Sequence, residues 1–246
     1  MTQKTTPQKP AVKFGDIVKA KINTVDFPES QYFREMRKKN QIVLHHTASG
    51  KGSNGDYNTW LRDKTRIATC IIIDYTGEIT QLFGSSFWGY HLGVTNQQIM
   101  NLLGSIKQNS TDLNANSIAI EVDCWGYLQK IDGEYRAYPN DFGRKGPKTV
   151  IPLENIQFYE KPFKGYTAFE KYTAAQIQTT KELLIYWHLT HGISLKYNED
   201  IWDLTKRAMS GENGVFTHNS YRKDKSDIHP QPEMIAMLKK LSQQYS

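Results

Sequence analysis

A short apolar run that ends in two histidines, QIVLHHTASG at residues 41–50, constrains this chain more than any other stretch. Gln41 to Leu44 are β-prone and small or flexible residues follow the histidines, so the pattern predicts a strand that stops at His45. A strand end holds a side chain rigidly, and imidazole is the commonest protein ligand for zinc. The ordinary alternative is a histidine satisfied by hydrogen bonds at a strand terminus. One imidazole cannot hold a metal alone, so its partners decide between the two interpretations.

The composition is that of a globular protein. With 246 residues, 38% of them hydrophobic, the chain can bury a sizeable core and most simply forms one domain with elaborations. The net charge of +6 would favour an anionic partner such as nucleic acid, a membrane surface or a bacterial cell wall. The basic residues are scattered, however, and the one local cluster, at 34–39, reads as a solvated face. Because no nucleic-acid motif occurs and no apolar run approaches the roughly 20 residues that span a bilayer, we expect no nucleic-acid partner and no stable membrane association.

The amino terminus lacks the features of a secretory signal. Met1 to Lys13 is polar and has no apolar core, so we expect a disordered arm on a protein made in the cytoplasm. Residues 1–39 would form this arm and a lead-in segment, and residues 40–246 the main domain. Cys70 and Cys124 each fall inside a predicted strand, which is typical of buried small hydrophobes, with a disulfide between them as the alternative.

Hydrophobic periodicity and turn residues predict the order of the elements. The predicted strands lie at 14–25 (an edge strand), 41–44, 68–74, 78–83 and 117–125. The predicted helices lie at 28–38, 96–106, 173–192 and 232–245. Residues 127–171 read as a surface elaboration, with a hairpin turn at Asp132-Gly133 and a polar loop at 140–148.

Two further stretches contain side chains that could belong to a functional site. Glu121 lies within the most apolar strand, where an unpaired charge costs several kcal/mol or shifts its pKa strongly. We therefore expect this carboxylate to face a site or a partner. The aromatic loop FWGYHLG at 87–93 either lines a cleft or covers the core.

A second apolar segment that ends in histidine, Gly214 to His218, supplies a partner for His45, and Asp227 follows nine residues after His218. Nitrogen and oxygen ligands of this kind suit zinc. The spacing by itself is weak evidence, because it lacks the compactness of an HExxH motif, which is absent from the chain.

Five motifs make the pattern specific: IVLHHTASG, ATCIIIDYTGEITQLF, WGYHLG, SIAIEVDCWG and THNSYRKDKSDIHP. In this order they resemble the zinc-dependent N-acetylmuramoyl-L-alanine amidases of the type 2 family, which includes amidase-type phage lysozymes and the peptidoglycan recognition proteins. The resemblance covers roughly residues 40 to 240. The run FKGYTAFEKYTAAQI is similar to bacterial and prophage members with an inserted region before the penultimate helix. The implied fold is α/β, a mixed central β-sheet flanked by helices, with zinc at the strand ends.

The resemblance also implies residue roles. They are zinc ligands His45, His218 and Asp227; general base Glu121; oxyanion-stabilising Lys225; and substrate-binding His46, Trp88 and His91. The departure from the family pattern lies between His218 and Asp227, where the family commonly has a passage rich in glycine and proline and this chain reads NSYRKD. Asp224 is therefore a rival third ligand.

The residues also fit the implied chemistry on general grounds. Zinc lowers the pKa of water and polarises a carbonyl, a carboxylate can move the proton, and a lysine can steady the developing oxyanion. The expected reaction is hydrolysis of the amide between the lactyl group of N-acetylmuramic acid and L-alanine in bacterial peptidoglycan. We expect a monomeric lytic enzyme, such as a phage or prophage endolysin released to the wall. The alternatives are a cytosolic muropeptide-recycling amidase and a non-catalytic peptidoglycan-binding module, although such modules lose a zinc ligand.

Overall fold

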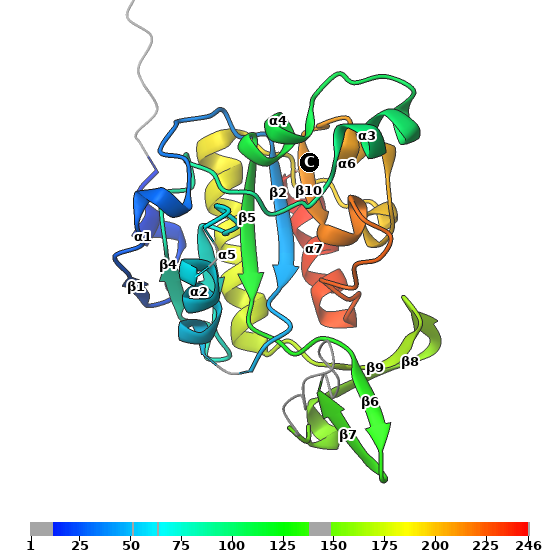
Figure 1. Cartoon of the computed structure of the whole chain (residues 1–246). Coiled ribbons are helices and arrows are strands. Elements are labelled where there is room, and N and C mark those ends of the chain that lie inside the picture. Colours follow the sequence, from blue (N-terminus) through cyan, green and yellow to red (C-terminus); the bar gives the residue numbers. More distant parts are fainter. Residues whose placement is uncertain (1–11, 51, 63, 138–148, 246) are drawn as a thin grey trace, which may run out of the picture.

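A mixed six-stranded sheet forms the centre of the molecule, as the resemblance implies (Figure 1). The computed structural model describes residues 12–50, 52–62, 64–137 and 149–245, so the predictions for residues 1–11 and for the loop at 140–148 fall outside the described residues. The strands of the sheet are β1 (Ile22–Thr24), β2 (Gln41–His46), β3 (Ile71–Ile73), β4 (Ile79–Gln81), β5 (Ser117–Val122) and β10 (Gly214–Thr217). Their order is β1-β4-β3-β5-β2-β10, and only the predicted hairpin β3–β4 is antiparallel.

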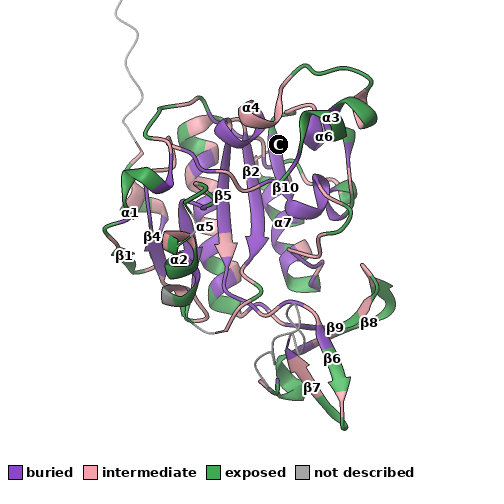
Figure 2. Ribbon diagram, in the orientation of Figure 1, coloured by how far each residue is buried: buried purple, intermediate pink, exposed green. Residues whose placement is uncertain are grey.

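The three parallel strands β10, β2 and β5 bring their carboxyl ends to one edge of the sheet. In their register His45 pairs with Glu121, while Thr217, the residue before His218, pairs with Leu44. Residues in register on neighbouring strands point to the same face, so the two histidines and the carboxylate belong to one neighbourhood. Every residue of the three strands is buried except Glu121, which is partly exposed near the end of β5 (Figure 2).

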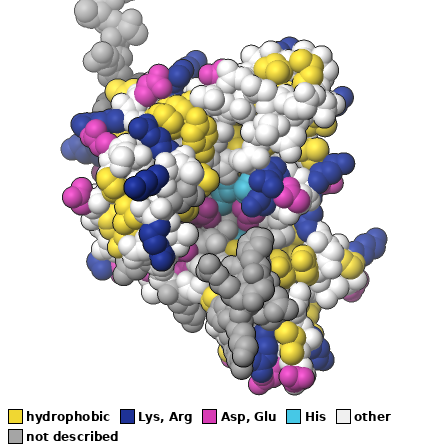
Figure 3. Space-filling view, in the orientation of Figure 1, with side chains coloured by type: hydrophobic (Ala, Val, Ile, Leu, Met, Phe, Trp, Pro, Cys, Tyr) yellow, Lys and Arg dark blue, Asp and Glu magenta, His cyan; other side chains and the backbone are white. Residues whose placement is uncertain are grey.

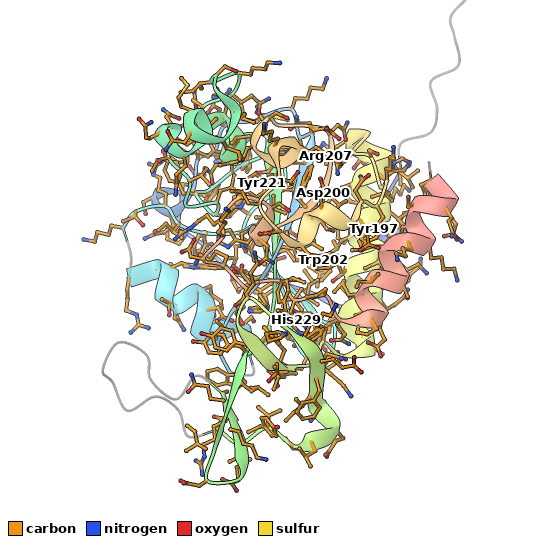
Figure 4. All side chains as sticks on the ribbon, turned by 90° about the vertical axis from the view of Figure 1, so that its right-hand side faces the viewer. Tyr197, Asp200, Trp202, Arg207, Tyr221 and His229 are labelled. Atoms are coloured by element: carbon orange, nitrogen blue, oxygen red, sulfur yellow. The ribbon has the colours of Figure 1, made fainter. Side chains whose placement is uncertain are left out.

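Helices cover both faces of the sheet. They are α1 (Phe14–Ile17), α2 (Ser53–Arg62), α3 (Asn96–Leu103), α4 (Ser110–Ala115), α5 (Ala174–His191), α6 (Lys206–Met209) and α7 (Pro232–Tyr245). Seen from the side, α5 and α7 lie on one face and α2 on the other (Figure 4). The predicted capping box forms at Thr173 and Gln176, and α5 ends at Gly192 in the left-handed conformation. None of the helices in the described residues is long and apolar enough to cross a membrane.

The lead-in segment differs from its prediction. The edge strand predicted over 14–25 forms only as β1, and its first part is wrong, because Phe14–Ile17 form helix α1. The predicted helix over 28–38 is also wrong, because only a 3-10 turn, η1 (Glu29–Gln31), is present. The backbone of this segment pairs instead with the aromatic loop. Phe33 exchanges two hydrogen bonds with Trp88, and the N–H of Arg37 donates to the carbonyl of Ser86. These long-range bonds outweigh local helix propensity, which is a weak preference.

The expectation of a solvated basic face is wrong for Lys39, whose side chain is 1% exposed. Its ammonium donates to the carbonyls of Phe87, Ala115 and Ser117 at 2.9, 2.5 and 3.1 Å. Burial lowers the pKa of Lys39 to about 7. Lys39 thus joins the aromatic loop to the start of β5. The two cysteines are buried and free, as predicted, although each lies just outside a strand.

Replacing Lys39 with methionine is expected to destabilise the protein by about 3 kcal/mol, because three buried carbonyls lose their shared donor. The melting temperature should fall by roughly 10 °C for a chain of this size. Calorimetry of this variant beside Lys38→Met, a change at an exposed neighbour, measures the difference. Equal melting temperatures for the two variants would mean that the Lys39 contacts contribute nothing net.

The described residues of the elaboration, 127–137 and 149–171, include two hairpins that lie beyond the carboxyl ends of β2 and β5 (Figure 1). The first pairs β6 (Leu128–Ile131) with β7 (Glu134–Ala137) across the predicted Asp132-Gly133 turn, where both residues have positive φ. The second pairs β8 (Ile156–Phe163) with β9 (Tyr166–Glu170). The remaining short elements are η2 (Leu153–Asn155), η3 (Glu199–Trp202) and η4 (His218–Ser220). On the far side of β10, η3 and α6 are joined by the ion pair of Asp200 with Arg207 at 2.7 Å (Figure 4).

Candidate active site

Three side chains from distant parts of the chain converge beside the sheet edge. His45 lies near the end of β2, His218 follows β10, and Asp227 lies in the loop before α7. Nδ1 of His45 is 3.1 Å from Nδ1 of His218, and Oδ2 of Asp227 lies 2.8 Å from the second nitrogen and 3.2 Å from the first. Within the described residues, this is the one group of histidine, cysteine or carboxylate side chains close enough to share a metal ion.

The hydrogen bonds of His218 show that its donor atom fits a metal. Its Nε2 lies 3.0 Å from the carbonyl oxygen of Leu92, which can only accept, so Nε2 carries the proton. In the neutral ring Nδ1 then presents a lone pair to the carboxylate oxygen of Asp227. The lone pairs of His218 Nδ1 and Asp227 Oδ2, whose atoms are 2.8 Å apart, would repel each other unless a cation lies beside them. This cation is either a proton or a metal ion. The donor set of two imidazoles and one carboxylate is one that zinc accepts.

A second chain of hydrogen bonds fixes the proton of His45. Ser117 Oγ donates to the carbonyl of Leu113 at 2.7 Å, so it accepts from Nε2 of His91 at 2.8 Å. In neutral His91 the other nitrogen, Nδ1, then accepts from Nε2 of His45 at 3.1 Å. This leaves the His45 lone pair on Nδ1, toward His218 and Asp227. Both ring nitrogens of His91 are engaged, so His91 orients a ligand in this structure, besides lining the cleft.

Replacing His91 with phenylalanine, which keeps a ring but removes both hydrogen bonds, is expected to weaken metal affinity by about 10- to 100-fold, because His45 loses the partner that fixes its tautomer. Competition with a chromogenic chelator measures the affinity. The control is His188→Phe on α5, whose ring bonds to the Ile193 carbonyl outside the cleft. Unchanged affinity in the His91 variant would assign His91 to another role.

The burial of the cluster sets its charge. Burial and repulsion from His218 lower the pKa of His45 to about 4, so its ring is neutral and can act as a ligand near pH 7. Burial would raise the pKa of Asp227, but attraction and hydrogen bonds from His218 and His45 outweigh it and hold this pKa well below its ordinary value. A neutral imidazole and an ionised carboxylate are the protonation states in which these side chains can bind a divalent cation.

Glu121 lines the same cleft, and its Oε2 is buried with no hydrogen-bond partner among the described residues. Burial raises its pKa well above the ordinary value, and the negative charges of Asp227 and Asp56 raise it further. Lys225 also lines the cleft and acts in the opposite direction on Glu121. An unpartnered carboxylate beside a metal-ligand cluster is suited to proton transfer.

Two other predicted residues, Asp224 and His46, lie in different surroundings. Asp224, the rival ligand, forms a bidentate pair with Arg222 at 2.5 and 3.0 Å and has an exposed carboxylate, so it stands outside the cluster. His46 lines the cleft, and burial lowers its pKa to about 4. Its Nδ1 bonds to the hydroxyl of Tyr172 at 2.8 Å.

The prediction that Trp88 contacts substrate does not fit this structure. Its side chain is 4% exposed, stacks on Phe33 at 3.9 Å between ring centroids, and is not part of the cleft lining. The indole donates to Glu35 at 3.3 Å. The lead-in segment therefore covers Trp88, whereas Tyr90 and His91 of the same loop do line the cleft.

The cleft has a volume of about 1040 Å³. In the space-filling view the histidines lie at the bottom of a hollow, with acidic side chains on one flank and basic side chains on another (Figure 3). Tyr172 and His229 lie beneath His46, and although both fall inside the quoted motifs, neither has a role predicted from the sequence. The Tyr172 hydroxyl accepts a hydrogen bond from the backbone N–H of His229 and also bonds to His46. The rings of Tyr172 and His229 stack at 4.5 Å between centroids.

Comparison with known proteins gives one family. Residues 35–232 match the sequence model of a family described as N-acetylmuramoyl-L-alanine amidase. No curated protein sequence gives a significant match.

Several solved structures are similar at low identity. The N-acetylmuramoyl-L-alanine amidase LysC from Clostridium intestinale URNW is 15% identical, and the alignment covers 90% of this chain and 97% of the LysC chain with a TM-score of 0.47. A selenomethionine derivative of AmpD is 14% identical, with coverages of 94% and 98% and a TM-score of 0.48. The Staphylococcus aureus hydrolase AmiA in complex with its ligand is 12% identical, with coverages of 96% and 93% and a TM-score of 0.45. Since these TM-scores are below 0.5, the family match alone carries the assignment.

Proposed function

Because the chain belongs to the N-acetylmuramoyl-L-alanine amidase family, whose substrate is peptidoglycan, we propose that it is a zinc enzyme that hydrolyses the amide between N-acetylmuramic acid and L-alanine. The observation that carries the proposal is the convergence of the His45, His218 and Asp227 donor atoms beside the unpartnered oxygen of Glu121. We assign zinc because two imidazole nitrogens and one carboxylate oxygen, side by side in an open cleft, form a protein donor set typical of catalytic zinc.

Each residue has one task in this proposal. His45, His218 and Asp227 would hold the ion, and bound zinc would supply Lewis acidity to water and to the substrate carbonyl. Glu121 takes the proton of the attacking water and passes it to the departing nitrogen of L-alanine. The Lys225 ammonium faces the negative charge that develops on the carbonyl oxygen. His46 and His91 flank these groups, with His91 acting on His45.

Replacing Lys225 with methionine is expected to lower kcat by about 100-fold with no change in bound zinc, because a cation aimed at the oxyanion acts in the transition state. Stem-peptide release and elemental analysis on one preparation test this, with Lys196→Met, an exposed lysine outside the cleft, as the control. A variant with wild-type kcat would remove Lys225 from the mechanism.

We propose further that residues 40–246 act as one catalytic domain, that the protein works as a monomer, and that its role is lytic, on the wall. The net charge of +6 supports the lytic role, because a cationic enzyme is attracted to an anionic cell wall. The other candidate is recycling of small muropeptides. A lytic enzyme clears purified sacculi, whereas a recycling enzyme prefers soluble anhydro-muropeptides. A higher kcat/KM on the soluble substrate would show that the protein recycles muropeptides and does not lyse the wall. The proposed reaction would stay the same in either case.

A further inference from the structure

Part of the cleft lining comes from the elaboration and from the residues that lead into it, and it has no assigned role. Trp125, Tyr127 and Tyr166, which we call the aromatic wall, line the same cleft as His45 and Glu121. Trp125 and Tyr127 follow β5, and Tyr166 begins β9. All three side chains are partly exposed. Residues far apart in the sequence therefore present ring surface to the space beside the candidate metal site.

The aromatic wall is preformed. The rings of Tyr127 and Tyr166 stack at 3.8 Å between centroids with an interplanar angle of 14°. The turn that delivers Tyr166 has positive φ at Lys164 and Gly165, the geometry of a tight hairpin. The Lys164 ammonium lies 2.7 Å from Asp203, so the hairpin tip is tied to the segment after η3.

The base of the same hairpin is fixed to the ligand loop. His229, two residues after Asp227, is fully buried and stacks on Phe169 of β9 at 4.7 Å. Its Nδ1 lies 2.7 Å from the hydroxyl of Tyr159 on β8, and its Nε2 donates to the carbonyl of Glu170 (Figure 4). A wall anchored at both ends loses little conformational entropy on binding.

The two parts of the cleft differ in charge. The loop at 222–225 carries three cations, and among the described residues only one of them, Arg222, forms an ion pair, with Asp224. Carboxylates of a stem peptide suit this loop. The aromatic wall is neutral, since Lys164 beside it is paired with Asp203. Flat amphipathic rings suit an uncharged ligand with apolar C–H faces and hydroxyl edges, which describes a pyranose.

We propose that the aromatic wall is a saccharide subsite that binds the pyranose rings of the glycan strand next to the muramic acid at which the amide is cleaved. The inference rests on the proposed function, because it places the glycan arm of peptidoglycan on one part of the cleft and the peptide arm on the other. In this proposal the elaboration makes the enzyme prefer glycan chains to single muramic acid units.

The test compares two substrates with the same stem peptide, one with a single muramic acid and one with a tetrasaccharide chain. For the wild-type protein kcat/KM should be about 10-fold higher on the chain, the size of one good aromatic contact, through a lower KM. In Tyr166→Ala this ratio should fall to near 1, and Tyr166→Phe should restore it. The control is Tyr135→Ala, a ring on the same elaboration that packs edge-on to Phe158 outside the cleft lining and should keep the ratio.

A second readout does not depend on catalysis. Titration with a peptide-free tetrasaccharide, followed by tryptophan fluorescence, should give a Kd about 10-fold higher in Tyr166→Ala than in wild type. If the wild type cleaves both substrates with a kcat/KM ratio near 1, or if Tyr166→Ala keeps the wild-type ratio, the saccharide subsite is wrong and the amidase proposal stands. If the zinc-loaded protein cleaves neither substrate yet binds the tetrasaccharide, the amidase proposal fails and the subsite remains.

Discussion

Replacing Glu121 with glutamine should slow stem-peptide release by at least ~100-fold, because the amide is nearly isosteric but cannot take the proton of water. The structure strengthens this expectation, since Oε2 of Glu121 has no hydrogen-bond partner among the described residues that the change could break. Zinc content and peptidoglycan binding should remain. Burial raises the pKa of Glu121 and disfavours its charge, so neutral glutamine should not lower stability.

The competing explanation is a carboxylate kept for stability. It requires a buried partner, and it predicts a loss of a few kcal/mol on the same change with the specific activity of the folded protein intact. Melting temperature, zinc content and product release measured on one preparation separate the two, with Glu160→Gln on the exposed face of β8 as control. Undiminished activity in a stable Glu121 variant would refute both explanations.

Loss of a metal ligand should have the second large effect. His218→Ala removes one of three converging donors, so we expect zinc to fall below stoichiometric content and turnover to fall by roughly 10³-fold or more, since the ion supplies several kcal/mol of transition-state stabilisation. Chelation of the wild type should produce the same loss, and added zinc should restore the wild type but not the variant.

The structure provides a matched pair of controls for this prediction. Asp227→Ala should lose zinc, whereas Asp224→Ala, three residues earlier and paired with Arg222 at the surface, should retain it. Elemental analysis of both variants decides the third ligand. Zinc lost from Asp224→Ala and kept by Asp227→Ala would reverse the assignment, and full zinc in His218→Ala would overturn the site itself.

The strands of the core could be predicted because each is a local apolar run bounded by turn residues. The side chains that end such runs, His45 and His218, stood out for the same reason, and Glu121 stood out because a carboxylate is costly in an apolar strand. What joins them is the parallel register of β10, β2 and β5, which depends on pairings between residues more than 70 positions apart and is not encoded in any one segment.

The errors have the same origin. Residues 28–38 have some local helix character, but their backbone pairs with the aromatic loop, which also buries Trp88 against Phe33. Lys39 resembles its exposed neighbours in sequence and differs only because three carbonyls from distant segments surround it. The tie of His91 to His45, and that of His229 to the elaboration, are likewise contacts that only the folded chain creates.

The most direct test of the central claim is the chemical identity of the bond that is cut. Purified sacculi are treated with the zinc-loaded protein, new amino termini are labelled, and the products are identified by mass spectrometry. The amidase account predicts new amino-terminal L-alanine on released stem peptides and glycan chains that keep intact lactyl carboxylates, with at least ~100-fold less of these products from Glu121→Gln in the same time. New reducing sugars, or new amino termini at any other residue of the peptide, would contradict it.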